Sequence, residues 1–394
     1  MDYTERLYNE LIIEESLLWY VYTDHTTKIM VKAPTIALKS IFKGCKVELL
    51  FGKDLSSEES FFHIGIKIHD IPTNGLIIIK TSRFIEDHIS LHEVMKQERT
   101  YVEFYNELNM CCMYSYLSID SADRNKVLTL LENLDQLYSG DLNDKAIHSL
   151  DCFEYSIDES FKISNVGRID ILKISIVFSG LKTLIIDYVG LNESNEIILD
   201  DSNEGDYFEK QIWALLDNIF PFNTYKNPII IKNSKTRELT DIFAYYDKGV
   251  FLIEIKAMAV LNIKDNQLIE RKISNVQKQI FKAIKQLVGA KKVIANKTPI
   301  FSTNRIELKF KKEITPHCIV LVNELIPFGN WKKIENEIFK TINIENIHLN
   351  VLDHVEFMKY VIASNGSKEF FDNLLIERVK FFIEKKNIFL KSSY

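Results

Sequence analysis

The stretch TDIFAYYDKGVFLIEIKAM, residues 240–258, predicts two strands joined by a tight turn. Leu239–Tyr246 and Val250–Met258 are rich in aromatic and branched residues, and the Asp-Lys-Gly between them suits a hairpin. The second strand carries Glu254 and Lys256 among apolar neighbours. A strand with one face in water would alternate more regularly, so we expect a buried hairpin that holds charge inside the fold.

Glu254 and Lys256 are two residues apart, so their side chains point to the same face of the strand. Asp241, on the preceding strand, is expected to lie close to both. Two carboxylates in a dry site repel each other unless a divalent cation compensates them. Mg²⁺ is normally held by one or two carboxylates with water, and the Ile255 carbonyl offers a further oxygen. The structural alternative is a buried ion pair that fixes the strand register.

The pattern of Asp241, twelve intervening residues and Glu254-x-Lys256 resembles the core of the PD-(D/E)xK nuclease superfamily. The resemblance covers residues 205 to 355. It implies an α/β fold of the restriction-endonuclease-like kind, with a mixed sheet flanked by helices, and Mg²⁺- or Mn²⁺-dependent cleavage of phosphodiester bonds. Asp241 and Glu254 are the implied metal ligands. Lys256 is the implied catalytic lysine, which would polarise a water or stabilise charge on the phosphate.

Two further residues fit the same resemblance. Glu209 lies in the first helix of this region, where many members carry an additional acidic residue, so it is a candidate catalytic residue and metal ligand. Gln279, in Gln279-x-x-x-Ala283, looks like the glutamine that Mrr-like and RecB-like members place on the helix after the lysine. Thr240 stands where the family name has proline, a loosely kept position. An ordinary first-turn glutamate and an ordinary helix-surface glutamine are the alternatives.

The 394-residue chain has a net charge of −6, but its charge is unevenly distributed. Residues 256–312 hold fourteen Lys or Arg and three Asp or Glu, a local net of +11, so the remainder carries −17. Such separation favours one face that binds a polyanion, and the resemblance makes DNA the expected partner. A helix predicted at 271–288 places four basic residues opposite its apolar stripe: Arg271, Lys278, Lys282 and Lys285. A merely solvated helix face is the alternative.

The chain exceeds the usual size of one domain and predicts two, an α+β domain over residues 1–195 and the nuclease-like domain over residues 205–394. The polar stretch 192–206 is the expected linker. The expected N-terminal elements are strands 46–51, 61–68 and 75–81, helices 90–108 and 122–138, and a hairpin of 169–178 and 183–190 that turns at 179–182. The expected C-terminal elements, besides the opening hairpin, are helix 207–219, strand 228–232, helix 271–288, a basic hairpin in 291–312, strand 318–322, helix 331–342, strand 348–352 and two closing helices.

Composition also bears on location and assembly. No apolar run reaches the roughly 18 residues of a membrane span, and the N-terminus is acidic where a signal peptide is basic, so we expect a cytoplasmic protein without membrane contact. Five cysteines without CxxC spacing are expected to be reduced and mostly buried. The resemblance implies a homo-oligomer and a prokaryotic restriction-type or anti-phage defence effector, whose first domain serves recognition, sensing or oligomerisation. The alternatives are a catalytically inactive nucleic-acid-binding module and a scaffold on the same fold.

Overall fold

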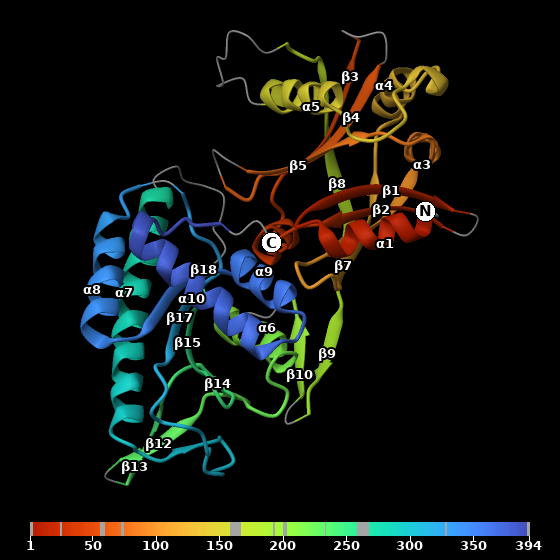
Figure 1. The fold of residues 1–394 in the computed structure, drawn as a ribbon. Helices are drawn as coiled ribbons and strands as arrows, with labels where there is room; N and C mark the ends of the chain where they lie inside the picture. The colour runs from red at the N-terminus through yellow and green to blue at the C-terminus, as the bar shows by residue number, and fades with distance from the viewer. Residues whose placement is uncertain are drawn as a thin grey trace. The chain divides into compact units, whose positions relative to one another are not determined.

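The computed structural model describes residues 3–23, 26–55, 60–71, 75–157, 167–191, 194–199, 203–232, 234–257, 268–327 and 329–391. These residues form a mixed α/β structure with ten α-helices and several sheets (Figure 1). The chain divides into two compact units, and each is described by itself. Unit 1 contains the described residues up to Leu184, and unit 2 contains those from Ile185 onward, apart from the undescribed segment 258–267.

Unit 1 is built on one eight-stranded sheet in the order β1-β2-β6-β7-β8-β3-β4-β5. Neighbouring strands are antiparallel except for β2 and β6, which are parallel. Residues of the two edge strands, β1 and β5, contact each other, so the sheet curls. The strands are β1 (Leu17–Thr23), β2 (Thr26–Lys32), β3 (Val47–Asp54), β4 (Phe61–Ile68), β5 (Leu76–Ser82), β6 (Arg99–Tyr105), β7 (Cys111–Ser118) and β8 (Ile171–Thr183).

Helices cover this sheet on separate patches of apolar side chains. Helix α3 packs against β1 and β2, and α5 packs against β4, β5 and β8. Below α5 the core contains Leu50 and Phe153, and the patch against α1 contains Trp19 and Met30. The helices are α1 (Tyr3–Ile13), α2 (Thr35–Phe42), α3 (Ile85–Lys96), α4 (Ser121–Leu130) and α5 (Asp144–Ile157).

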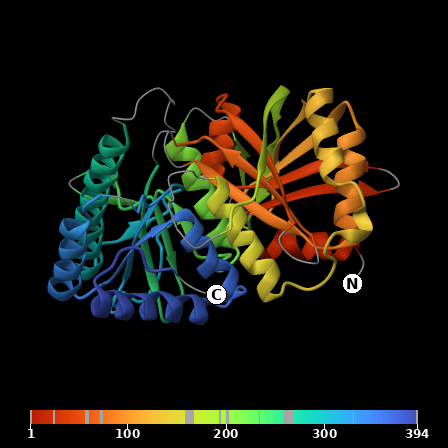
Figure 2. The ribbon, with the colours of Figure 1, turned by 90° about the horizontal axis from the view of Figure 1, so that it is seen from above.

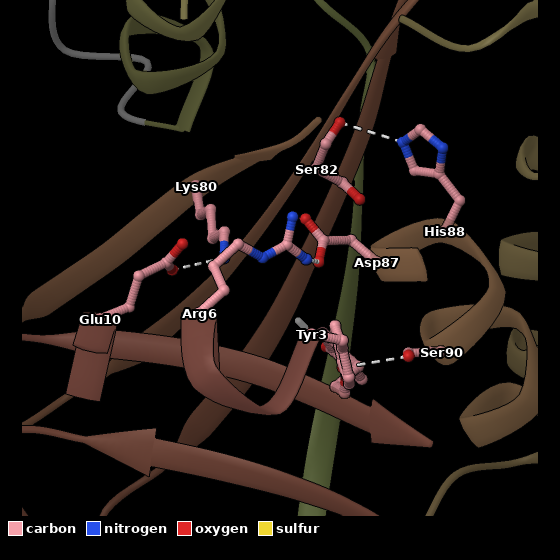
Figure 3. A network of polar contacts seen from close by, with 9 residues as sticks. Tyr3, Arg6, Glu10, Lys80, Ser82, Asp87, His88 and Ser90 are labelled. Atoms are coloured by element: carbon pink, nitrogen blue, oxygen red, sulfur yellow. Dashed lines mark hydrogen bonds and ion pairs between the residues drawn. The ribbon is translucent and has the colours of Figure 1, made fainter. Parts of the chain in front are cut away.

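A polar network fastens α1 to the rest of unit 1 (Figure 3). Arg6 of α1 forms an ion pair with Asp87 of α3. Lys80 of β5 lies 3.0 Å from the Glu10 carboxylate of α1, and its Nζ lies 3.3 Å from the centre of the Trp19 ring. Burial lowers the pKa of Lys80 despite the carboxylates nearby, and burial raises the pKa of Asp87. The attachment of α1 therefore depends on charged groups held out of water.

Unit 2 is built on a five-stranded mixed sheet in the order β11-β14-β15-β17-β18. The first three strands are antiparallel neighbours, and β15, β17 and β18 run parallel. Two smaller sheets have the orders β10-β9 and β13-β12-β16. The strands are β9 (Ile185–Val189), β10 (Ser194–Ile198), β11 (Thr224–Lys226), β12 (Ile229–Lys232), β13 (Lys235–Glu238), β14 (Ile242–Tyr245), β15 (Val250–Lys256), β16 (Ile300–Phe301), β17 (His317–Val322) and β18 (His348–Asp353).

Helices lie on both faces of the main sheet of unit 2. Helices α7 and α8 pack together on one face, and α6 lies on the other with α9 beside it (Figure 2). The predicted apolar stripe of α7 is confirmed, since Ile273, Val276, Ile280, Ile284 and Leu287 are all buried. None of the described helices is long and apolar enough to cross a membrane. The helices are α6 (Glu204–Asp217), α7 (Leu268–Ala295), α8 (Lys332–Glu345), α9 (His354–Ser364) and α10 (Lys368–Lys385).

Several sequence predictions are confirmed. The three N-terminal strands correspond to β3, β4 and β5, and the opening hairpin corresponds to β14 and β15. The helices and parallel strands expected at the C-terminal end are present as α7, β17, α8, β18, α9 and α10. All five cysteines are free thiols, and all except Cys111 are buried.

Four predictions in less regular parts of the chain are wrong in part. The helix predicted over 90–108 ends at Lys96, and Arg99–Tyr105 form β6, where buried side chains alternate with partly or fully exposed ones at the period of a strand. The helix predicted over 122–138 ends at Leu130. The turn predicted at 179–182 lies inside β8, where Gly180 adopts a φ of +71° next to a register shift. In the predicted basic hairpin, residues 291–295 are still part of α7.

Candidate functional site

The β14–β15 hairpin brings the three key residues together at its open end. Ile242 faces Ile253, so the next position along places Asp241 opposite Glu254. Lys256 is the last residue of β15. Its Nζ lies 2.6 Å from Glu254 Oε2 and 3.4 Å from Asp241 Oδ2. The predicted cluster of two carboxylates and one lysine is therefore present.

Backbone contacts hold Asp241 in place just before β14. The Ile255 backbone N–H donates to Asp241 Oδ2 at 2.5 Å, and the Asn227 N–H donates to the Asp241 carbonyl at 2.8 Å. The buried hydroxyl of Thr240 donates to the Ile253 carbonyl at 2.7 Å. Thr240 thus ties this segment to β15 through its side chain, which a proline here would not do. Asp241 keeps 9% of its surface exposed and Glu254 1%, so access is from the Asp241 side.

Glu209 of α6 belongs to the same electrostatic cluster. It precedes the buried residues Ile212 and Leu216 by three and seven positions, so it lies on the helix face that packs inward. Burial, followed by the charge of Asp241, raises the pKa of Glu209 to about 7. The same two causes raise the pKa of Glu254 to about 7. Asp241 thus repels both Glu209 and Glu254 at the end of the sheet.

Glu238, at the end of β13, is a fourth acidic residue that the sequence reasoning missed. Partial burial and the neighbouring Asp241 raise the pKa of its carboxyl group. The available signal was an acidic residue three positions before Asp241 in the same segment. Lys256 opposes this negative charge. Burial lowers its pKa, but Asp241 and Glu254 outweigh that effect and hold the pKa above its ordinary value.

The acidic side chains at this site fit a metal ion that is held by two carboxylates better than a metal ion that is held by three. In the ranges that the structure describes, no group of three or more His, Cys, Asp or Glu side chains is arranged to hold a metal ion. Asp241 and Glu254 remain as a facing pair, and Mg²⁺ commonly uses one or two carboxylates with water. The raised pKa values of Glu209 and Glu254 indicate uncompensated negative charge that a divalent cation would relieve.

Gln279 and the basic residues of α7 lie along a helix that leads away from the cluster. Gln279 is exposed. Among the described residues, no hydrogen bond or ion pair connects it to Asp241, Glu254 or Lys256. Lys272 Nζ lies 3.1 Å from Oε2 of Glu324, a residue that follows β17 closely in the chain. Helix α7 therefore begins near the end of the sheet at which the parallel strands β15 and β17 finish. Exposed Arg271 lies at this end, whereas Lys285 is about 21 Å further along the axis. Lys278 and Lys282, also exposed, lie between them.

No protein-family model matches the sequence, and no curated protein matches it.

Proposed function

We propose that unit 2 is a metal-dependent nuclease with a restriction-endonuclease-like core that hydrolyses phosphodiester bonds, preferably of DNA. The observation that carries the proposal is the facing pair of Asp241 and Glu254 with Lys256 Nζ at 3.4 and 2.6 Å from their oxygens. A structural ion pair would need one carboxylate. Here one ammonium faces two buried carboxylates, with the half-buried Glu209 beside them, and such an excess of buried negative charge is costly unless it serves a site.

Asp241 and Glu254 are the residues that would hold Mg²⁺ or Mn²⁺, and Glu209, whose pKa responds to the charge of Asp241, would accept a hydrogen bond from a coordinated water. The bound cation would polarise a phosphate oxygen and lower the pKa of a water nucleophile. The carboxylate oxygens that would face the cation now accept hydrogen bonds from Lys256. Cation binding would therefore release the Lys256 ammonium from one of its two partners.

Each side chain then has a distinct task. The Lys256 ammonium would donate a hydrogen bond to a phosphate oxygen, where negative charge grows in the transition state. Ile255 N–H keeps Asp241 oriented through the 2.5 Å hydrogen bond to Oδ2. Glu209, whose pKa of about 7 allows both protonation states near neutral pH, accepts a proton from the attacking water. Arg271, at the near end of α7, is placed to contact the nucleic-acid backbone.

The test is a cleavage assay on supercoiled plasmid, linear duplex, single-stranded DNA and RNA, with Mg²⁺, Mn²⁺ or EDTA. The variants are Lys256→Ala and Asp241→Asn. Lys380→Ala is the control, because Lys380 forms an exposed ion pair with Glu377 on α10. We expect metal-dependent cleavage by the wild type and the control, and its loss in both site variants with their folding retained.

Two results would contradict the proposal. One is cleavage that persists in Lys256→Ala, because the lysine would then have no part in the chemistry. The other is a well-folded wild type that cuts none of the four substrates and shows no change in melting temperature with Mn²⁺. In that case, salt-sensitive DNA binding that survives Asp241→Asn would identify a binding module instead.

A further inference from the structure

The closed end of the β14–β15 hairpin borders a pocket that the proposed cleavage site does not use. The pocket has a volume of about 760 Å³, within the roughly 300–1,000 Å³ typical of small-molecule sites. It lies between the hairpin turn, the segment after β16 and the start of α10. Asp241, just before β14, and Tyr245, at the end of β14, are four residues apart in extended chain, so the pocket lies about 13 Å from the acidic cluster.

The pocket has an excess of positive charge. Four lysines line it (Lys248, Lys309, Lys311 and Lys368), against two acidic residues, Asp247 and Glu369. Lys248 Nζ lies 3.9 Å from Glu369 Oε1, so these two charges largely compensate each other. The other three lysines form no hydrogen bond or ion pair with any residue in the described parts of the chain. Three free ammonium groups around one hollow favour a ligand with more than one phosphate.

Aromatic rings form the wall beside these lysines. Phe310 and Tyr245 line the pocket, with their ring centres 5.5 Å apart. Behind Tyr245, the Tyr225 ring is stacked nearly parallel at 6.1 Å. Lys309 and Lys311 flank Phe310 in the chain and are exposed, whereas Phe310 packs inward against Phe243. Partly exposed rings between free cations are the arrangement by which proteins bind unpaired bases together with their phosphates.

Tyr246, which also lines the pocket, is held rigidly. The Tyr246 hydroxyl donates to Asp372 Oδ2 at 2.7 Å, and His317 Nε2 lies 2.8 Å from Asp372 Oδ1. Gly249 makes the contact between Tyr246 and Asp372 possible, because a Cβ at position 249 would lie 2.4 Å from the Tyr246 ring and 2.8 Å from Asp372 Oδ2. Tyr246 thus keeps its position without a ligand, which lowers the ordering cost of binding.

We infer that this pocket binds a single-stranded segment of nucleic acid, with a base against Phe310 and Tyr245 and phosphates on Lys309, Lys311 and Lys368. The inference rests on the proposed function for the identity of the polyanion. It goes further by naming an unpaired strand as the bound form. At about 3.4 Å per stacked nucleotide, the distance of about 13 Å between the pocket and the acidic cluster corresponds to roughly four nucleotides. The pocket would therefore hold the strand at a fixed distance from the cleaved bond.

The experiment measures binding of fluorescein-labelled oligo-thymidine by anisotropy in EDTA, over a range of salt concentrations, so that cleavage plays no part. The first variant is Lys309→Ala/Lys311→Ala. Its matched control is Lys380→Ala/Lys385→Ala, two exposed lysines of α10. The second variant is Phe310→Leu, which keeps an apolar side chain but removes the ring.

We expect the lysine variant to bind about 25-fold more weakly at about 0.1 M salt and to lower the salt slope by about 1.4, the effect of two lost phosphate contacts on a single strand. Phe310→Leu should weaken binding about 5-fold or more with the slope unchanged. The control pair should bind like the wild type, and Lys309→Arg/Lys311→Arg should restore binding.

Full binding by both pocket variants would overturn the inference, whatever the plasmid assay shows. Equal displacement of the oligonucleotide by poly-glutamate would also overturn it, because the pocket would then be a general polyanion site. Loss of cleavage in Lys256→Ala would support the cleavage site, and weaker oligonucleotide binding by both pocket variants would support the pocket separately. A wild type that binds no oligonucleotide yet cuts plasmid would refute the pocket alone.

Discussion

A Lys256→Met variant tests the charge arrangement at the end of β15 most directly. Glu254, 1% exposed, would lose the ammonium that lies 2.6 Å from its carboxylate. Removing one partner of a buried pair typically costs about 3–5 kcal/mol of the free energy of unfolding. The exposed pair of Lys380 and Glu377 has the same 2.6 Å separation, with side chains 64% and 50% exposed. Such surface pairs contribute about 0–1 kcal/mol, so Lys380→Met is the matched control.

The penalty should depend on pH, because Glu254 can bind a proton instead of a lysine. Burial and Asp241 raise the pKa of Glu254 to about 7 with Lys256 present, and removing Lys256 raises it further. At about pH 6 the carboxyl is neutral in both proteins, so most of the penalty disappears. Above pH 7 the variant still binds the proton that the wild type has released. The difference in the free energy of unfolding between wild type and variant therefore grows by about 1.36 kcal/mol per pH unit, or about 2.7 kcal/mol by pH 9.

The assay is urea unfolding in EDTA at about pH 6, 7.5 and 9, followed by tryptophan fluorescence. Trp213 and Trp331 are buried in unit 2 and report on it, while Trp19 reports on unit 1, so two transitions are fitted. If Lys256→Met lowers the free energy of unfolding by the same amount at all three pH values, protonation of Glu254 does not set the penalty and the reasoning is refuted. Equal losses in Lys256→Met and Lys380→Met would refute it as well.

Further predictions follow from single features. In EDTA, the folded Glu254 carboxyl binds its proton more tightly than the unfolded one, so this group alone should lower wild-type stability by about 3.4 kcal/mol as pH rises from 4.5 to 7, and Glu209, with a similarly raised pKa, should add to the fall; a flat profile in urea unfolding would contradict this. Mn²⁺ should raise the melting temperature more at about pH 8 than at about pH 6, and Asp241→Asn should abolish the rise in calorimetry. Gly249→Ala should destabilise unit 2 by about 1–3 kcal/mol, since the new Cβ would lie 2.4 Å from an aromatic carbon of Tyr246. Gly289→Ala, in open space on α7, should instead stabilise unit 2 by up to about 1 kcal/mol. If chemical denaturation shows similar effects for the two variants, the close contact at Gly249 is not the cause. Arg6→Met should detach α1 and speed hydrogen exchange in residues 3–13 but not in α7; unchanged exchange would show that the ion pair does not hold the helix.

The candidate site could be predicted because its geometry is local. The turn at 247–249 sets the hairpin register, and the register places Asp241 opposite Glu254 without any information from elsewhere in the chain. Lys256 then follows from the two-residue period of a strand. Glu209 was expected from the family resemblance, and the period of α6 places it on an inward face. Its proximity to Asp241, however, depends on how α6 packs against the sheet.

Features that depend on distant pairing were not predictable in this way. Residues 99–105 have both helical and strand-like patterns, and pairing with β2 and β7 decides between them. Gly180 looks like a turn residue, but β7 holds the chain extended around it. The pocket beside Tyr245 combines segments far apart in sequence, so only the structure places Lys309 next to Lys368.

The mixed sheet of unit 2 also implies an order of assembly. Ile242 and Ile253 pair across 11 positions, whereas Phe251 and His317 pair across 66. Closing the longer loop costs about 1.6 kcal/mol more entropy, and parallel pairing of this kind is slow. The antiparallel hairpin can therefore form while the chain is still being synthesised, before β17 exists. The acidic pair is then already in register when α7 and β17 arrive to bury it, so the late step of folding encloses a site whose charges are in place.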